Sequence, residues 1–447
     1  MHAIYSYASA NLIFLGEDDS AMATDAFAAI IALSCESLAS TRGRQNFRLM
    51  VTESGARIAV APAAVATFSV LFHRKAVLSL LSRPWFRRLW IVQEATLACS
   101  NTCYRGDGFM PLKDILRVGV WLRYKQLALG SDTMTDEGFG ILTCLFDTTD
   151  REEGMFYTHF PEPGVSVISS LLGMLRDFEA TDPRDHIYGM MGLSRYYCPA
   201  ELPIHIQPDY SKSTAEIFAE ATRLCLLDKG SSDAWQYIRY RPSWHHGGEL
   251  PSWVPPWDAV ADITNDNHFF APHFKADNNS KARLMVNSVV GWNEIGVDGF
   301  VIGVVTKCSH VCDYLDDWVA FVADPAASWL DDKVVGTSND TKQAVNRTLL
   351  ADNAYGERAG HEDINSIDDL RVYVSDQACS HALFPQFQEF QDCGQHDSNS
   401  DRRLDSLRRS ADLCWKACAH PCLFTTSKGG LGLGPPTLGL GDVIVIL

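Results

Sequence analysis

The amino-acid sequence predicts an α/β protein, because short apolar runs alternate with helical patterns near its start. Residues 11–16 form an apolar run that ends in glycine, and a helical pattern follows over about residues 21–38. Strand, turn and helix in this order are typical of an α/β sheet. Residues 65–81 predict a second helix, and residues 101–106 predict another strand. The chain therefore starts with elements suited to a sheet covered by helices.

Composition and charge exclude several classes of protein. The 447 residues are enough for about two or three domains with a sizeable core. Hydrophobic residues make up 46% and charged residues 21%, which excludes a wholly disordered or fibrous chain. Lys and Arg number 38 against 55 Asp and Glu, a net charge of −17. Such an acidic chain is not expected to coat a phosphate backbone, so nucleic acid is not a predicted partner.

No membrane span or secretory signal is expected, and the chain is predicted to be cytoplasmic. The longest uncharged stretch, residues 58–72, is too short for a bilayer, which needs about 20 residues. The first residues lack the basic and apolar regions of a secretory signal. The 13 cysteines are an odd number without a framework pattern, which predicts reduced thiols in the cytosol.

A helix rich in aromatic and basic residues is predicted over residues 84–98. Pro84 suits the first helical position, where its missing N–H costs nothing. Trp85 lies on one apolar stripe of this helix, and Trp90 and Gln93 lie on the stripe beside it. The pattern indicates a mostly apolar helix whose ionisable residues lie next to aromatic side chains.

Glu94 is the carboxylate with the most chemical interest. Spacings of three and seven residues bring Arg87, Trp90 and Glu94 close together on a helix. A carboxylate among tryptophans can have a raised pKa and serve acid–base or ribose-binding chemistry. The structural alternative is an ion pair with Arg87, Arg88 or Arg184, and the residues alone favour it.

Three further helical signals follow. Residues 165–178 form an amphipathic pattern. In the next turn, Asp182 can cap a helix, Pro183 suits its first position, and Asp185 can reach back to the cap. Residues 213–216, Ser-Thr-Ala-Glu, are a capping box and predict another helix.

The amino-acid composition of the chain changes after residue 230. Tryptophan and proline are dense around residues 250–257, which excludes long helices there. Strands are expected over 282–287 and 295–305. Two more are expected over 423–426 and 443–447, joined by a glycine-rich loop. This region is predicted to be mixed α+β.

Two patterns invite a ligand-binding interpretation that the residues do not sustain. The glycine-rich residues 428–436 lack the Gly-Lys-Ser/Thr order and the following helix of a phosphate loop. Cys414, Cys418 and Cys422 recur every four residues and could approach zinc on a helix. Pro421 interrupts such a helix, and there is no second cysteine pair. We therefore predict neither a metal site nor a cofactor.

Five segments, in order and spacing, resemble the fungal heterokaryon-incompatibility (HET) domain family. Residues 83–98 look like its W-F-x-R-x-W-x-x-Q-E motif, and residues 180–193 look like A-x-D-P-R-D-x-x-Y-x-x-x-G-L. Residues 208–213, 250–257 and 425–447 resemble its D-Y-S-K-S, L-P-S-W-x-P-x-W and glycine-rich tail motifs. The positions expected to be motif or structural residues are Trp85, Arg87, Arg88, Trp90, Gln93, Asp182, Pro183, Arg184, Asp185 and Tyr188.

The resemblance implies an incomplete, doubly wound sheet similar to Toll/interleukin-receptor domains, with a helical extension. Family signatures that normally precede residue 4 are missing, and the tail stops within its last motif, so we expect truncation at both ends. Lost central strands would expose apolar edges and helix faces. The expected parts are a partial HET domain (1–105), a helical extension with the Asp-Pro-Arg-Asp motif (106–230) and the C-terminal region (231–447).

The resemblance also implies a function in regulated cell death after fusion of genetically different hyphae. The favoured hypothesis is an effector or regulator of self/non-self recognition that acts by association with protein partners, a second copy of itself included. The alternative is an NAD-cleaving enzyme, because the run from Trp90 to Glu94 is similar to the W-C-x-x-E pattern of such domains. Glu94 is then the catalytic candidate, with Trp85 or Trp90 stacked on the substrate NAD. The second alternative is an inactive remnant.

Overall fold

The computed structural model forms two compact units. Residues 1–238, 245–261 and 284–296 make the first unit, and residues 239–244, 262–283 and 297–447 make the second. The structure describes residues 2–17, 26–31, 77, 79–106, 108–129, 136–149, 167–197, 206–227, 233–238, 250–259, 291–309, 343, 346–350, 353–354, 357–358, 422–435 and 437–446.

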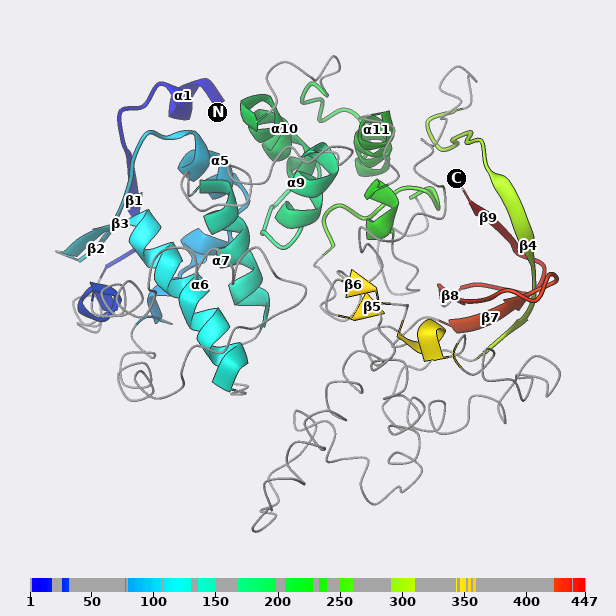
Figure 1. Cartoon of the computed structure of the whole chain (residues 1–447). Coiled ribbons are helices and arrows are strands. Elements are labelled where there is room, and N and C mark those ends of the chain that lie inside the picture. The colour runs from blue at the N-terminus through cyan, green and yellow to red at the C-terminus, as the bar shows by residue number, and fades with distance from the viewer. Residues whose placement is uncertain are drawn as a thin grey trace, which may run out of the picture. The chain divides into compact units, whose positions relative to one another are not determined.

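The first unit combines helices with a small sheet (Figure 1). Its elements are α1 (His2–Ser6), β1 (Asn11–Phe14), the 3-10 helix η1 (Pro84–Arg87), α5 (Trp90–Leu97), β2 (Asn101–Arg105), β3 (Gly108–Pro111), α6 (Leu112–Leu129), α7 (Asp136–Thr149), α9 (Val167–Leu175), α10 (Asp185–Tyr197), α11 (Thr214–Leu227) and the 3-10 helix η2 (Asp233–Tyr237).

The sheet of the first unit has the order β1-β2-β3. β1 pairs parallel to β2, and β2 pairs antiparallel to β3. The predicted strands at 11–16 and 101–106 are confirmed, as is the broad α/β class. A parallel pair with helices between its strands is the expected start of an α/β sheet. The doubly wound, Toll/interleukin-receptor-like arrangement stays a prediction.

One face of this sheet carries exposed apolar side chains. Ile13 and Cys103 point into the core and are buried. Leu12, Phe14 and Phe109 alternate with buried positions and are 68%, 60% and 68% exposed. Side chains on a strand alternate between its two faces, so the exposed residues share one face.

The single helix expected over residues 84–98 is wrong, because the backbone breaks at Arg88. Arg88 is extended (φ −74°, ψ 132°) and forms a parallel bridge with Glu179. The Leu89 N–H donates to the Glu179 carbonyl at 2.9 Å. This long-range bond separates η1 from α5, which sequence periodicity alone does not reveal. Pro84 does begin the first of the two helices, as predicted.

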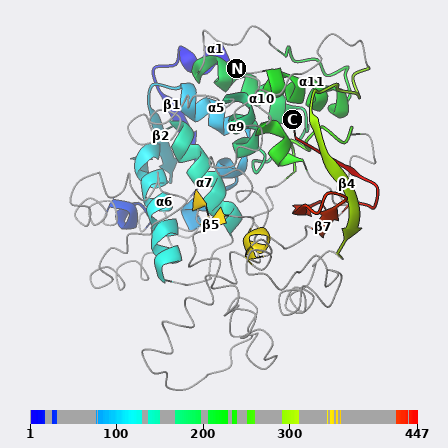
Figure 2. The same cartoon turned by 45° about the vertical axis from the view of Figure 1, so that its right-hand side comes forward.

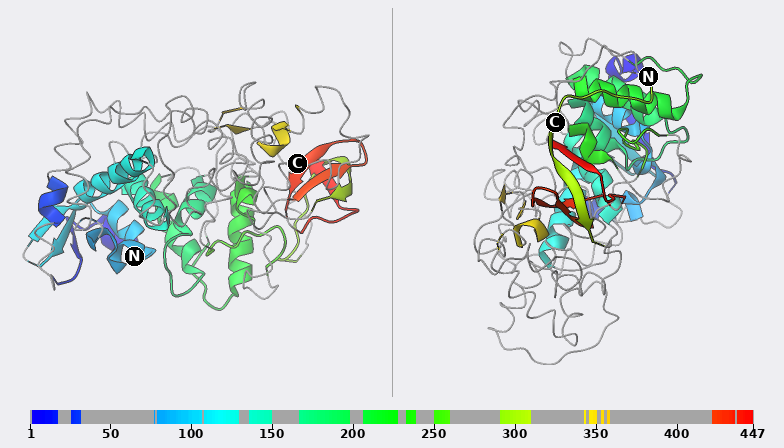
Figure 3. Two further views of the ribbon diagram at one scale, coloured as in Figure 1. Left: turned by 90° about the horizontal axis from the view of Figure 1, so that it is seen from below. Right: turned by 90° about the vertical axis from the view of Figure 1, so that its right-hand side faces the viewer.

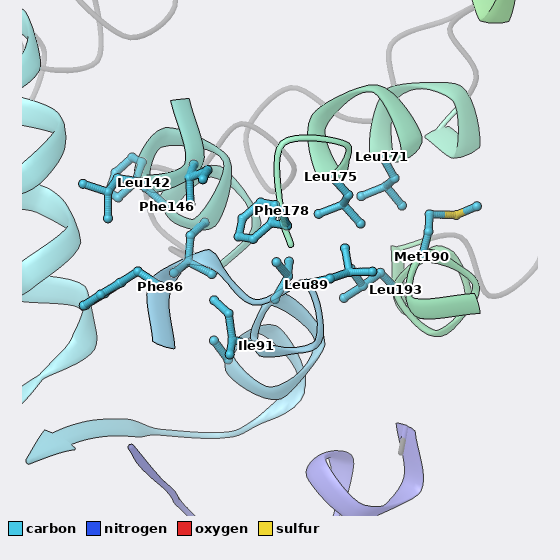
Figure 4. Packing of buried hydrophobic residues seen from close by; sticks show 14 of the residues in the cluster. Phe86, Leu89, Ile91, Leu142, Phe146, Leu171, Leu175, Phe178, Met190 and Leu193 are labelled. Atoms are coloured by element: carbon cyan, nitrogen blue, oxygen red, sulfur yellow. The ribbon is translucent and has the colours of Figure 1, made fainter. Parts of the chain in front are cut away.

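The core of the first unit lies where α5, α7, α9 and α10 meet (Figures 2 and 4). Figure 4 shows Leu89, Leu175 and Phe178 converging between these helices. The predicted helix over 165–178 is confirmed as α9. The labelled core residues are Phe86, Leu89, Ile91, Leu142, Phe146, Leu171, Leu175, Phe178, Met190 and Leu193.

The tryptophan- and proline-rich segment covers α11. The indole N–H of Trp257, a fully buried residue, donates to the Thr222 hydroxyl at 3.0 Å. The Arg223 guanidinium lies 5.0 Å from the centre of the Trp253 ring. The predicted capping box of α11 is confirmed, since the Ser213 N–H and hydroxyl both contact a Glu216 carboxylate oxygen at 2.8 Å.

The second unit contains an antiparallel sheet of order β8-β7-β4-β9. Its strands are β4 (Phe300–Cys308), β7 (Cys422–Thr426), β8 (Leu431–Gly434) and β9 (Val443–Ile446), and a separate pair is formed by β5 (Asn353–Ala354) and β6 (Glu357–Arg358). The strand expected over 295–305 lies later, as β4. The strand expected over 282–287 falls outside the described residues.

The glycine-rich stretch is not merely the loop that was expected, since part of it forms β8. β8 pairs with β7, and Gly432 lies opposite Phe424. A Cβ atom on Gly432 would come within 2.6 Å of the Phe424 ring. The glycine is therefore needed because an aromatic side chain lies across the neighbouring strand.

Candidate functional site

The contact between α5 and α10 depends on a buried glutamine and two glycines. Gln93 is 3% exposed, and its side-chain amide donates to the Gly189 carbonyl at 3.1 Å. A Cβ atom on Gly192 would collide with the Gln93 amide. The lack of a side chain at Gly192 thus lets the two helices approach closely at the glutamine. Gln93 Oε1 is buried without a hydrogen-bond partner in the described part of the chain.

Asp185, the first residue of α10, joins three parts of the first unit. One carboxylate oxygen accepts from the Trp90 indole N–H at 3.3 Å. The other accepts from the Tyr210 hydroxyl at 2.6 Å. Asp185 therefore does not reach back to cap its own helix, as was expected, because both carboxylate oxygens bind aromatic side chains. The hydrogen bonds link α5, α10 and the loop before α11.

Arg184 fixes the same loop from the other side. Its guanidinium binds both carboxylate oxygens of Asp182, at 2.9 and 2.7 Å. It also donates to the backbone carbonyls of Tyr210 and Lys212, at 2.8 and 2.7 Å. The guanidinium carbon lies 5.0 Å from the centre of the Tyr210 ring. A planar guanidinium has the several donors that this arrangement requires, whereas a lysine ammonium has no such fork.

The turn before α10 follows the predicted capping pattern in part. The Arg184 backbone N–H donates to Asp182 Oδ1 at 3.0 Å, so Asp182 does act as a cap. Pro183 follows, and its carbonyl accepts from the His186 N–H at 3.2 Å. The regular helix begins at Asp185, later than the cap alone suggests.

Tyr188 adds a second tie to the loop. Its hydroxyl donates to the Asp209 carbonyl at 2.9 Å and accepts from the Asp209 N–H at 3.0 Å. The Tyr188 and Tyr210 rings meet edge to face, with centroids 5.1 Å apart. The loop is therefore held by paired backbone contacts as well as by side chains. We call Asp182, Arg184, Asp185 and Tyr188, together with residues 209–213, the loop latch.

Glu94 lies at the contact of α5 with α1, and its hydrogen-bond partner is Tyr5. Burial, the hydrogen bond to Glu94 and the charge of Glu94 raise the pKa of Tyr5 to about 12. The expected ion pair with an arginine is not formed in the described part of the chain. Arg87 instead lies 3.6 Å from a Glu179 carboxylate oxygen, and Arg184 binds Asp182. The break at Arg88 removes the helical spacing on which the predicted triplet depends.

Charges in the loop latch are held by their neighbours. The Arg184 hydrogen bond lowers the pKa of Asp182, and hydrogen bonds to Ser211 lower the pKa of Asp209. Burial, followed by the hydrogen bond to Asp185, raises the pKa of Tyr210. All three residues therefore keep their usual charge at neutral pH.

The predicted site residues fall into two groups. Trp90, Gln93, Asp182, Arg184, Asp185 and Tyr188 meet around α5 and α10, with Pro183 in the same turn. Trp85 instead packs edge to face on Phe86, and Arg87 and Arg88 lie with η1 against Glu179. Sequence reasoning missed Tyr5, Gly192 and Tyr210 as contact residues. Tyr210 lies in the D-Y-S-K-S motif, which could have pointed to it.

Two negative findings concern only the described residues. They contain no cluster of three or more His, Cys, Asp or Glu side chains placed to hold a metal ion. Among them, too, no helix is both long and apolar enough to cross a membrane. Cys414 and Cys418 lie outside the described residues, and Cys422 is buried in β7.

Comparison with known proteins assigns the first part of the chain to a family. Residues 1–94 match the family described as heterokaryon incompatibility protein (HET). The heterokaryon incompatibility protein 6, OR allele, of Neurospora crassa is 26% identical over 197 residues. That alignment covers 40% of this chain and 28% of the relative, so the chain spans less than a third of the length of that protein. No solved structure matches the chain.

The structure is of the α/β class, and its first 94 residues are similar to the heterokaryon-incompatibility family. Over residues 1–94 the chain is similar to the HET family, and the relative that it matches is a heterokaryon incompatibility protein. The matched segment ends at Glu94, within α5. Asp185 connects α5 to a residue well beyond this segment, because it accepts hydrogen bonds from both Trp90 and Tyr210.

Proposed function

We propose that this chain is an effector of fungal self/non-self recognition that promotes cell death by associating with protein partners. The family relationship supports the incompatibility role. The mode of action is inferred from what the motif residues contact and from what surface they leave exposed.

The internal use of the motif residues favours association over chemistry. Both oxygens of Asp182 bind Arg184, and both oxygens of Asp185 bind aromatic donors. A carboxylate whose two oxygens already accept hydrogen bonds from the protein is less available to attack or protonate a substrate. In this proposal the loop latch is a scaffold that keeps the domain rigid.

The observation that carries the proposal is the exposed face of the β1-β2-β3 sheet. Phe14 pairs in register with Tyr104, and Tyr104 pairs with Phe109, so these rings form a row across the sheet. The Tyr104 and Phe109 rings lie 5.8 Å apart, and Leu12 is exposed beside them. Exposed apolar residues gathered on one face are typical of a protein-interaction surface. The β1 part of this face, with Leu12 and Phe14, belongs to the segment that matches the family, and Tyr104 and Phe109 follow that segment.

The test is expression in a fungal host, scored for cell death, with one charge placed on the face. Phe14→Lys should strongly reduce killing, because a charge at the centre of an apolar interface is costly. Tyr7→Lys is the matched control, because Tyr7 is an exposed aromatic residue away from the sheet. The control should kill like the wild type. Equal killing by Phe14→Lys and the wild type, at equal protein levels, would overturn the proposal.

NAD cleavage is a second candidate, favoured by the position of Glu94. Its carboxylate lies one helical turn from Trp90, which is only partly buried, and it is held by Tyr5. A positioned carboxylate beside an indole ring suits a role in stabilising a positively charged ribosyl group. In this candidate, Glu94 carries the chemistry and Trp90 stacks on the nicotinamide.

The same assay separates the candidates when NAD is measured with it. Glu94→Gln keeps the size of the side chain and removes its charge. The association proposal expects undiminished killing by Glu94→Gln and unchanged NAD in wild-type cells. Loss of NAD with the wild type, abolished by Glu94→Gln, would instead establish the enzymatic function. A wild-type chain that neither kills nor consumes NAD would identify an inactive remnant.

A further inference from the structure

We propose that Cys308 and Cys422 are a redox-sensitive pair, which a hydroperoxide converts from two neighbouring thiols into a reversible disulfide between β4 and β7. This inference concerns the second unit alone and is independent of the proposed function. It rests on the register of the two strands, on the exposure of the two thiols and on the contacts of the side chains around them.

The register of β4 and β7 places the two cysteines on one face of the sheet. The strands are antiparallel neighbours, and Figure 3 shows the yellow-green ribbon of β4 beside the red strands of this sheet. Cys308 lies directly opposite Phe424, and Cys422 lies two residues before Phe424. Side chains two residues apart on a strand share a face, so Cys422 is a diagonal neighbour of Cys308.

The two strands stay bound to each other at this point. The Ser309 N–H donates to the Leu423 carbonyl at 2.8 Å, and the Leu423 N–H donates to the Ser309 hydroxyl at 3.0 Å. Diagonal neighbours in a sheet are about 7–8 Å apart, and a disulfide joins Cα atoms about 4.4–6.8 Å apart. A small movement therefore closes the bond. Such a movement is local, because Cys308 ends β4 and Cys422 begins β7.

The Phe424 ring does not stand between the two thiols. A Cβ atom on Gly432 would come within 2.6 Å of this ring, and one on Gly434 within 3.2 Å. Both glycines belong to β8, which lies on the side of β7 away from β4. The ring therefore leans away from Cys308, although Phe424 is its direct partner in the register.

The two thiols differ in their access to solvent. Cys308 is partly exposed, whereas Cys422 is 2% exposed. Burial, followed by the charge of Cys308, raises the pKa of the Cys422 thiol to about 11. The influence of Cys308 on Cys422 agrees with the register in placing the two sulfurs near each other. An oxidant from solvent therefore reaches Cys308 first, and Cys422 is the thiol that closes the disulfide.

The oxidation balances in two steps. The Cys308 sulfur attacks one oxygen of the hydroperoxide, so an S–O bond forms, the O–O bond breaks, and the leaving oxygen departs as water or an alcohol with the thiol proton. The Cys422 sulfur then attacks the Cys308 sulfur. The S–S bond forms, the S–O bond breaks, and hydroxide leaves as water with the Cys422 proton. Two thiols lose two electrons to the peroxide, and a thiol reductant reverses the change.

Closure exchanges one contact of β7 for another. The Cys422 thiol donates to the Pro435 carbonyl, with sulfur and oxygen 3.2 Å apart, and Pro435 follows β8. A disulfide sulfur has no proton to donate, so this hydrogen bond is lost when β7 is linked to β4. The new bond also closes a loop of roughly 110 residues, which restrains the unfolded chain and stabilises the folded one.

The first test is peptide mass spectrometry on the full-length, reduced protein after treatment with hydrogen peroxide and alkylation of the remaining thiols. A peptide pair linked through Cys308 and Cys422 should form, and dithiothreitol should remove it. The same oxidation in concentrated urea should give about fivefold less of this pair, because 13 cysteines then compete across long loops.

Two variants add a measurement of stability. Peroxide should raise the Tm of the wild type by about 3 °C or more, and Cys308→Ser should lose this shift together with the linked peptide. Cys99→Ser is the matched control, because Cys99 is an exposed cysteine of the first unit, and it should behave like the wild type.

Four results would overturn the proposal. They are the absence of the linked peptide from the oxidised wild type, an equal yield of it from folded and urea-unfolded chains, preferential pairing of either cysteine with a different one, and an undiminished Tm shift in Cys308→Ser. The comparison of folded with unfolded wild type needs no variant, so it holds even if Cys308→Ser does not fold.

Discussion

Asp185 shows how a single carboxylate can organise a site that sequence spacing does not reveal. Its two aromatic donors, Trp90 and Tyr210, lie 95 positions before it and 25 positions after it. The capping pattern of its own turn predicts only a local role. The long-range role depends on α5 and α10 packing together, and Gly192 leaves the room that this packing needs.

Gly192 carries a prediction at the residue scale. Gly192→Ala should lower the free energy of unfolding by about 1–3 kcal/mol, because the added methyl group collides with the buried Gln93 amide. Urea denaturation of the two proteins measures the difference.

Gly189→Ala is the control on the same helix, one turn earlier. Its Cβ atom would lie 3.5 Å from Leu89, an ordinary contact. Alanine favours a helix over glycine by up to about 1 kcal/mol, so this variant should be neutral or stabilised. A loss of stability in Gly189→Ala as large as in Gly192→Ala would show that the Gln93 contact is not the cause.

At the scale of elements, the sequence predicts those helices that are determined by interactions between neighbouring residues. α9 follows from its amphipathic pattern, and α11 follows from a capping box that forms as expected. The division between η1 and α5 could not be predicted, since it depends on a bridge to Glu179. β8 could not be predicted either, because its glycines are typical of a loop. Their place in a strand is explained only by the Phe424 ring, which lies opposite Gly432 on β7.

The contact of α10 with α9 should make stability depend on pH. His186 is 4% exposed, and burial lowers the pKa of its imidazole, against smaller opposing effects of Asp258, the Leu175 backbone and Asp185. The unfolded chain, with a His pKa of about 6.5, therefore binds the proton first as the pH falls. The His186 contribution is complete above that pH and decreases toward the lower, folded-state pKa.

We expect the free energy of unfolding to fall below about pH 6.5, by up to about 1.4 kcal/mol per pH unit from this residue. This window lies above the one in which Asp182 and Asp209, with their lowered pKa values, are protonated. Denaturation at several pH values measures the slope. His186→Gln should have a shallower slope between about pH 7 and 5.5, and an unchanged slope would contradict the assignment.

At the scale of the whole molecule, the family match and the folded body do not have the same limits. The match ends at Glu94, yet α5 is bound to Asp185 and, through it, to the loop before α11. Sequence comparison matches only residues 1–94 to the family, and the motif resemblance indicates which distant segments belong with them. Only the structure shows that these segments are bound together.

The account rests on the claim that the matched segment and the Asp-Pro-Arg-Asp turn form one interlocked body. A double-mutant cycle with Trp90→Phe and Asp185→Ala tests it most directly, with stability measured by denaturation. We predict a coupling energy of about 1 kcal/mol, because the indole N–H donates to a carboxylate. The control cycle of Trp90→Phe with Glu216→Ala, in the cap of α11, should be additive. Additivity of Trp90→Phe and Asp185→Ala within about 0.3 kcal/mol would contradict the claim.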